Sequence, residues 1–204
     1  MVRGRLTGAN TAPAWSPDGH CLAYLSRWGT ENYAQESRVI TIRDLEAGTE
    51  HIVSPKLAYM ERLRWAPGGD SLLVSGSDGK SRAGLFQVDA KTGETTPIVR
   101  ERSTKFRGFE GIWSPDGKAV YYIHEGPEQG FSIRRMLVET YEETTLHRSP
   151  VSLPLHDLAL SPDGSQLAFA TRDPVIKQAE VLQLLPVDGG APSKLLTARN
   201  AVLV

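Results

Sequence analysis

The chain carries one six-residue phrase four times, and this repeat constrains the fold more than any other feature. The copies read Ala-Trp-Ser-Pro-Asp-Gly at 14–19, Arg-Trp-Ala-Pro-Gly-Gly at 64–69, Ile-Trp-Ser-Pro-Asp-Gly at 112–117 and Ala-Leu-Ser-Pro-Asp-Gly at 159–164. Measured from Trp15, Trp65, Trp113 and Leu160, the spacings are 50, 48 and 47 residues. A fixed period of this length indicates an array in which each repeat is one supersecondary unit and stacked neighbours supply the core.

Each phrase has the chemistry of a tight turn that follows a short strand. Pro presets φ at the second turn position, Asp suits the third, and Gly adopts a positive φ without a side-chain clash. We expect the turns to be formed by Asp18, Gly19, Gly69, Asp116, Gly117, Asp163 and Gly164. The residue at the Trp position ends the preceding apolar stretch, so we expect Trp15, Trp65 and Trp113 to pack between neighbouring repeats.

Three further strands complete each repeat. The second strands (22–25, 72–74, 120–123 and 167–170) are apolar on consecutive positions, as in strands buried on both faces. The third strands span 39–42, 85–88, 133–138 and 181–187, and the fourth strands span 50–53, 95–99, 144–146 and 194–196. The turns that join them contain Asp or Gly, except for the turn at 139–142, which has neither. No segment shows sustained helical periodicity. The predicted fold class is all-β, a β-propeller of four-stranded antiparallel blades with four blades present.

The repeated phrase, continued as Trp-Ser-Pro-Asp-Gly-Lys/His-x-Leu-Ala-Tyr, resembles the PD40, or WD40-like, repeat of TolB-type β-propellers. Similar repeats form the propellers of tricorn-type proteases and of prolyl-oligopeptidase-family peptidases. The resemblance covers nearly the whole chain, and the tail Pro186–Pro192 also looks like a TolB-like blade end. Leu160 in place of Trp and Gly68 in place of Asp depart from the pattern. A TolB-like protein would be periplasmic or extracytoplasmic.

The predicted organisation is a single propeller segment over residues 1–204. The blades span about 8–54, 55–100, 101–148 and 149–197, and residues 3–7 match a fourth strand, so we expect them to be the last strand of a preceding blade. Neither end leaves a blade incomplete for strand exchange. We therefore expect an open segment of a six- to eight-bladed ring with exposed end blades that favour self-association; a closed four-bladed ring is the alternative.

Composition excludes several classes of function. With 23 basic and 24 acidic residues the formal net charge is −1, which gives no basic excess for nucleic acid. The single Cys21 excludes an intrachain disulfide. Residues 1–6 lack the apolar core of a signal peptide, and no apolar run is long enough to span a membrane.

No catalytic, metal or cofactor motif stands out. A Gly-x-Ser-x-Gly nucleophile elbow is absent, and the five histidines have no His or Cys partner at ligand spacing. The repeated Asp18, Asp116 and Asp163 read as turn formers rather than as calcium ligands. No Gly-rich phosphate loop opens a helix. We therefore expect no enzyme activity in this chain, no cofactor and no metal.

The connections after the second and fourth strands vary in length and content, and they carry the candidate binding residues. The connections after the second strands span 26–37, 75–83, 124–130 and 171–178, and those after the fourth strands span 54–60, 100–108 and 147–157. Alternate turns of an up-and-down sheet emerge at one edge, and loops on a rigid scaffold usually carry recognition. The expected binding residues are Trp28, Tyr33, Tyr59, Arg102, Phe106 and Arg107.

These residues favour a non-catalytic TolB-like scaffold that binds a protein or peptide through its variable loops. The basic side chains of those loops favour an acidic or carboxylate-bearing partner. The alternative is the substrate-gating propeller of a prolyl-oligopeptidase- or tricorn-type serine peptidase whose catalytic domain lies outside this chain. A third reading is the sensor portion of a bacterial regulator.

Overall fold

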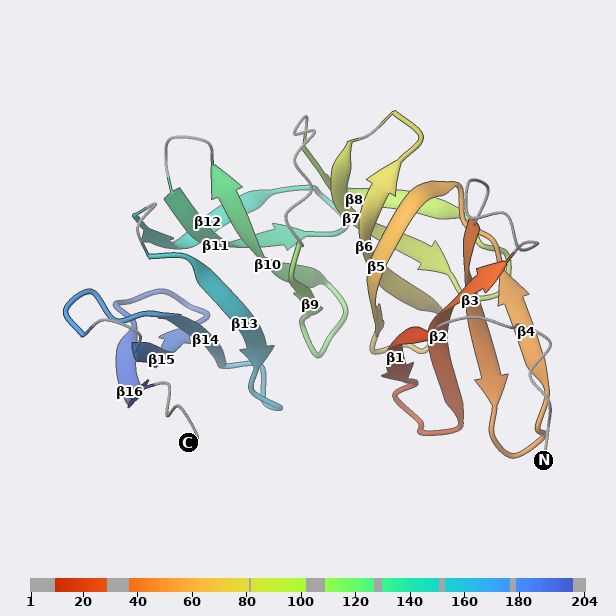
Figure 1. Ribbon diagram of the computed structural model, residues 1–204, viewed down its shortest axis with the longest axis horizontal. Helices are drawn as coiled ribbons and strands as arrows, with labels where there is room; N and C mark the ends of the chain where they lie inside the picture. Colours follow the sequence, from red (N-terminus) through yellow and green to blue (C-terminus); the bar gives the residue numbers. More distant parts are fainter. Residues whose placement is uncertain are drawn as a thin grey trace. The chain divides into compact units, whose positions relative to one another are not determined.

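The computed structural model describes residues 10–28, 37–80, 82–101, 109–126, 130–150, 153–176 and 179–199. The chain divides into two compact units, Met1–Phe109 and Glu110–Val204, each of which contains two blades (Figure 1). The strand predicted at residues 3–7 lies outside the described residues. We describe each unit by itself.

Unit 1, coloured red to yellow-green in Figure 1, contains two four-stranded antiparallel sheets. The first sheet, blade 1, has the order β1-β2-β3-β4, with β1 (Thr11–Trp15), β2 (Cys21–Trp28), β3 (Ser37–Asp44) and β4 (Glu50–Val53). The second sheet, blade 2, has the order β5-β6-β7-β8, with β5 (Leu57–Trp65), β6 (Ser71–Asp78), β7 (Ala83–Asp89) and β8 (Thr95–Arg100).

Unit 2, coloured green to blue, repeats this arrangement. Blade 3 contains β9 (Gly111–Trp113), β10 (Ala119–Gly126), β11 (Gly130–Leu137) and β12 (Glu143–Ser149). Blade 4 contains β13 (Leu155–Leu160), β14 (Gln166–Arg172), β15 (Ala179–Pro186) and β16 (Ser193–Arg199). The predicted fold class, all-β with four antiparallel four-stranded propeller blades, is confirmed. Every regular element of the described residues is a strand, and none of them forms a helix that could cross a membrane.

Each unit buries a core between its two blades. In unit 1 the core joins side chains of β2 and β3, such as Leu25 and Ile40, to Met60, Leu63 and Leu72 of blade 2. In unit 2 it joins Ile133 of blade 3 to Phe169 and Leu185 of blade 4. Residues 71–76 of β6 and 119–123 of β10 are buried at every position, as expected for strands covered on both faces.

Three of the four repeated turns share one hydrogen-bond pattern. In the third copy, the Ser114 hydroxyl donates to Asp116 Oδ1 at 2.6 Å and accepts the Ala119 amide at 2.9 Å, and Asp116 Oδ1 accepts the Lys118 amide at 3.1 Å. The copies at Ser16 and Ser161 repeat these bonds. The second copy has no such side chains, yet it keeps the turn, because the Gly69 amide donates to the Ala66 carbonyl at 3.0 Å.

The Trp position does not pack in the same way in every blade. Trp65 is half-buried and its indole Nε1 donates to the Ala14 carbonyl of blade 1 at 3.0 Å, and Trp113 is buried. The expected packing is wrong for Trp15, which is 62 % exposed. No blade precedes blade 1 within the described residues, so nothing offers Trp15 the surface that blade 1 offers Trp65.

Consecutive blades of a unit also meet through the repeated turns. A Cβ atom added at Gly164 would lie 3.0 Å from the Pro115 ring, and one added at Gly69 would lie 3.9 Å from the Pro17 ring. Both glycines adopt a positive φ, of 74° and 72°. Glycine at this position therefore allows the positive φ that the turn requires, and its lack of a Cβ atom leaves room for the proline ring of the preceding blade.

The turn between the third and fourth strands has the same backbone in blade 3 as in blade 2, although its sequence differs. Tyr141, at φ 58°, takes the place of Gly93, at φ 76°. The Tyr141 amide donates to the Leu137 carbonyl at 2.9 Å, as the Gly93 amide donates to the Asp89 carbonyl at 3.0 Å. A non-glycine residue in this left-handed region explains why the turn at 139–142 had no recognisable sequence pattern.

Candidate functional site

The connections of each blade lie at two opposite edges. Since the strands are antiparallel and paired in sequence order, the connections after the second and fourth strands share one edge, which we call the loop edge. The repeated turn and the turn between the third and fourth strands share the other, the turn edge. In unit 1 the loop edges of both blades adjoin, because Arg38 at the start of β3 contacts residues 59 and 60 near the start of β5.

This contact is the candidate functional site. Arg38 NH1 donates to the Met60 carbonyl at 2.8 Å, and its guanidinium carbon lies 5.3 Å from the centre of the Tyr59 ring. The guanidinium is thus in range of a cation–π interaction while a backbone bond fixes its position. Tyr59 remains 40 % exposed. Blade 1 therefore supports an exposed aromatic side chain of blade 2.

The predicted binding residues are only partly within the described chain. Tyr59 lies on β5 and not in a loop, because the inner strand begins at Leu57 rather than at Leu63. Trp28 is the last residue of β2, at the loop edge. The other four candidates, Tyr33, Arg102, Phe106 and Arg107, lie outside the described residues. Sequence reasoning did not single out Arg38, which directly precedes the apolar run of β3.

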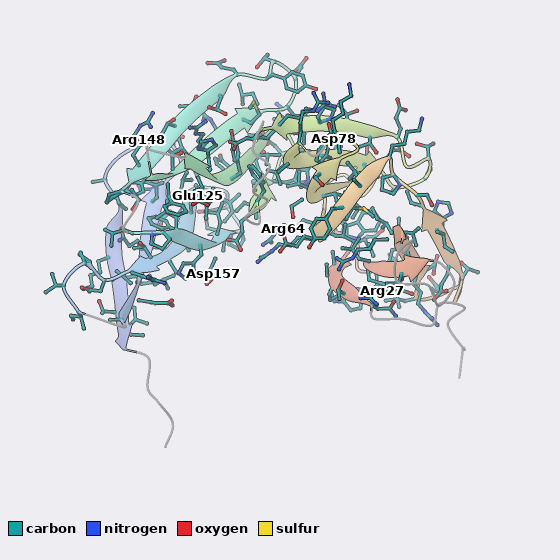
Figure 2. The ribbon with its side chains drawn as sticks, turned by 45° about the horizontal axis from the view of Figure 1, so that its top comes forward. Arg27, Arg64, Asp78, Glu125, Arg148 and Asp157 are labelled. Carbon is teal, nitrogen blue, oxygen red and sulfur yellow. The ribbon has the colours of Figure 1, made fainter. Side chains whose placement is uncertain are left out.

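The loop between β6 and β7 is held by Asp78. Its Oδ1 accepts the Lys80 and Arg82 amides at 2.9 and 3.1 Å, and its Oδ2 lies 2.7 Å from Arg82 NH2. These bonds, first of all the one from the Arg82 side chain, lower the pKa of Asp78 to about 2. Figure 2 shows Asp78 and Arg64 well apart on blade 2, which fits their places at the end of β6 and near the end of β5.

A pocket of about 530 Å³ lies between the two blades of unit 1. Because each sheet twists, the β7–β8 turn of blade 2 comes beside the end of β4: a Cβ atom added at Gly93 would lie 2.9 Å from Val53 Cγ1. The pocket is lined by Ser54, Lys56, Leu57, Asp78, Phe86, Thr92–Thr95 and Arg100.

The loop edge of unit 2 carries side-chain contacts of its own. His156 Nδ1 lies 2.8 Å from Asp157 Oδ2, and His156 Nε2 lies 3.6 Å from Glu180 Oε1. Glu125 of β10 and Arg148 of β12 pair with consecutive residues of β11 and so lie near the same edge, as Figure 2 shows. Asp157 adopts φ 57°, at a register shift in β13.

Within the ranges that the structure describes, no group of three or more His, Cys, Asp or Glu side chains is arranged to hold a metal ion. The oxygens of the turn aspartates accept hydrogen bonds from neighbouring hydroxyls and backbone amides. These bonds lower the pKa of Asp18 and that of Asp116 below the usual range. They lower the pKa of Asp163 to about 2. The described part of the site consists of the exposed ring of Tyr59, the Arg38 guanidinium beside it and the pocket of unit 1.

The curated proteins that this chain resembles include peptidases. The chain is 27 % identical over 149 residues to tricorn protease homolog 1 of Streptomyces coelicolor, a match to 72 % of this chain and 13 % of that protein. It is 33 % identical over 99 residues to dipeptidyl-peptidase 5 of Trichophyton schoenleinii, a match to 47 % of this chain and 13 % of that protein. The chain thus spans only a small part of the relatives that it matches. No family model matches it.

Solved structures show the fold. The match to a prolyl endopeptidase structure covers 93 % of this chain and 29 % of the endopeptidase chain, with a TM-score of 0.67 and 16 % identity. The match to the β-propeller domain of the trilobed protease from Pyrococcus furiosus covers 92 % of this chain and 57 % of that chain, with a TM-score of 0.62 and 14 % identity. The match to TolB from Acinetobacter baumannii covers 89 % of this chain and 52 % of the TolB chain, with a TM-score of 0.52 and 18 % identity. At these identities the likeness concerns the β-propeller fold alone, which this chain shares with TolB and with the propellers of larger peptidases.

Proposed function

We propose that this chain is a non-catalytic β-propeller scaffold that binds a protein or peptide through the loop edges of its blades. The contact between Arg38 and Tyr59 is the observation that carries this proposal. It presents an aromatic side chain, 40 % exposed, at the junction of two blades, and a charged hydrogen bond of 2.8 Å fixes the guanidinium beside it.

Aromatic and arginine side chains dominate the binding energy of protein interfaces. An anchor that is already held in place loses less conformational entropy when a partner binds. Tyr59 has two strands of support, since β5 is paired with β6 and Arg38 comes from β3. Trp28 at the end of β2 and Arg107 in the connection after β8 are further anchors under this proposal.

The named relatives favour a second candidate function. Tricorn protease homolog 1 and dipeptidyl-peptidase 5 are peptidases, and the chain matches 13 % of each. Under this proposal the scaffold is the propeller portion of a larger serine peptidase, and it gates or orients the peptide substrate. A serine-peptidase domain in the same gene product would support this candidate, and a gene product without one would contradict it.

Binding to an array of random-sequence peptides tests the main proposal. We expect the chain to select a subset of peptides and Tyr59→Ala to weaken their binding at least about fivefold, about 1 kcal/mol. Tyr141→Ala is the matched control, because Tyr141 is 51 % exposed in a turn at the turn edge of blade 3. No selected peptide, or an equal loss for both variants, would contradict the proposal.

A further inference from the structure

The pocket of unit 1 combines an apolar floor with a charged rim. Phe86, which is 1 % exposed, and Leu57 supply the apolar side chains. The rim is formed by the segment after β4, by the β7–β8 turn and by the two strand ends at Asp78 and Arg100. A volume of about 530 Å³ lies within the range of small-ligand sites and is sufficient for one or two amino-acid side chains.

The acidic side chain at the end of β6 is already neutralised. Both oxygens of Asp78 accept hydrogen bonds, and Arg82 supplies two of the three donors, its amide and its Nε. Its second terminal nitrogen also lies 2.7 Å from Asp78 Oδ2 as an ion pair. Only 12 % of the Asp78 side chain is exposed. Asp78 therefore shapes the loop and does not offer a free carboxylate to the pocket.

Two cations at the rim have no such partner among the described residues. Neither Lys56 nor Arg100 makes a hydrogen bond or ion pair through its side chain with any residue that the structure describes, and both are exposed. The remaining carboxylate of the lining is that of Glu94, also exposed and without an ion pair among the described residues. With Asp78 offset by Arg82, the lining therefore has one uncompensated positive charge.

We infer that this pocket binds a carboxylate group of a peptide, with Lys56 and Arg100 as the groups that hold it. Arg can bind a carboxylate through two parallel N–H···O bonds, and Lys supplies a mobile point charge. The hydroxyl of Ser54, at the same rim, is a further donor. The aliphatic part of the bound residue would lie against Phe86 and Leu57. This inference rests on the proposed function and names the chemistry of the ligand.

The carboxylate could come from an acidic side chain or from a peptide C terminus, and three probe peptides separate these sources. The first is an alanine-based peptide with acetylated and amidated ends and one glutamate. In the second, glutamine replaces the glutamate. The third keeps the glutamine and has a free C-terminal carboxylate. Affinities are measured by isothermal titration calorimetry on the full chain.

We expect the first or the third peptide to bind and the second not to bind. Lys56→Gln and Arg100→Gln should each weaken binding about tenfold, because each removes one charge-assisted contact. Glu94→Gln should strengthen it, since it removes the like charge. Lys91→Gln is the matched control, because Lys91 is an exposed lysine in the β7–β8 turn, which also contains Glu94, but does not line the pocket. All four changes are at exposed positions, and circular dichroism checks the fold.

The outcomes separate this inference from the proposed function. Equal affinities for all three probes, or full affinity in Lys56→Gln and Arg100→Gln, would overturn the carboxylate site. Peptides selected from the random array that bind through Tyr59 without a carboxylate would overturn it too, while leaving the proposed function standing. An array that selects no peptide would contradict the proposed function itself.

Discussion

Removing the hydroxyl of Tyr122 tests a cross-strand cluster that occurs in blades 1 and 3. Tyr122 is fully buried, and its phenol donates to Glu143 Oε2. Glu143 Oε1 in turn lies 2.8 Å from Arg134 NH1. Blade 1 has the same three residue types, with Tyr24 Oη and Arg43 NH1 each 3.1 Å from Glu50 Oε1. Tyr122→Phe keeps the ring and deletes only this bond.

A hydrogen bond to a charged group contributes about 1.5–3 kcal/mol, but the Glu143 side chain is 35 % exposed, so water can partly replace the lost donor. We therefore expect Tyr122→Phe to lower the free energy of unfolding by about 1–2 kcal/mol. Tyr24→Phe is the matched comparison and should cost less, about 0.5–1 kcal/mol, because Tyr24 is only half-buried.

Hydrogen exchange followed by mass spectrometry in increasing urea measures both effects separately, since β10–β12 and β2–β4 give different peptides. Tyr122→Phe should speed exchange in β10–β12 and leave β2–β4 unchanged. An unchanged opening free energy in β10–β12, or an equal loss in both variants, would show that the Tyr122–Glu143 bond does not stabilise blade 3.

The same cluster predicts a dependence on alkaline pH. Burial, and then the bond to Glu143, raises the pKa of the Tyr122 phenol above its usual range. The unfolded chain ionises this group near pH 10, and the folded chain does not. The stabilisation is therefore complete below about pH 10 and is lost as pH rises above it. In Tyr122→Phe this part of the alkaline loss should be absent.

Three further predictions concern glycine, the repeated turn and the Trp position. A Cβ atom at Gly84 would lie 1.9 Å from a backbone oxygen of β8, so Gly84→Ala should cost about 1–3 kcal/mol or more in urea unfolding, whereas Gly79→Ala, with nothing within 4 Å, should be nearly neutral. The Ser161 hydroxyl and the Ser165 amide lower the pKa of Asp163 to about 2, so its contribution to stability is present above about pH 4 and lost as pH falls toward 2; Asp163→Asn should flatten that part of an acid unfolding curve. Trp65→Phe removes the hydrogen bond to the Ala14 carbonyl, and it should lower the free energy of unfolding by about 0.5–1.5 kcal/mol in addition to the effect of the lost ring contacts. Trp15→Phe, at an exposed position, should have little effect on the free energy of unfolding.

The fold could be predicted from the sequence because each blade repeats the same local chemistry. Ser16, Ser114 and Ser161 make the same turn bonds, so three copies of the phrase support one interpretation. The turn at 139–142 could not be recognised, since Tyr141 holds a left-handed backbone that usually belongs to glycine. The early start of β5 could not be predicted either: its exposed residues alternate with Met60 and Leu63 in a pattern broken by two register shifts.

The site depended on contacts between blades that one repeat does not encode. The sequence predicts Tyr59 as a loop residue, but its support comes from Arg38, which is 21 residues earlier and on another sheet. The pocket forms because the sheet twist places the β7–β8 turn beside Ser54, and this places part of a turn edge in the lining. Asp89 organises that turn, because its Oδ1 accepts the Lys91 and Thr92 amides.

Hydrogen exchange of the chain with and without a peptide selected from the array shows which edge of the blades the peptide covers. We expect slower exchange at the loop edge of unit 1, in residues 37–38, 57–60, 78–80 and 82–83, and no change in the repeated turns at 16–19 and 66–69. Slower exchange confined to the repeated turns, with the loop edge unchanged, would contradict binding through the loop edges.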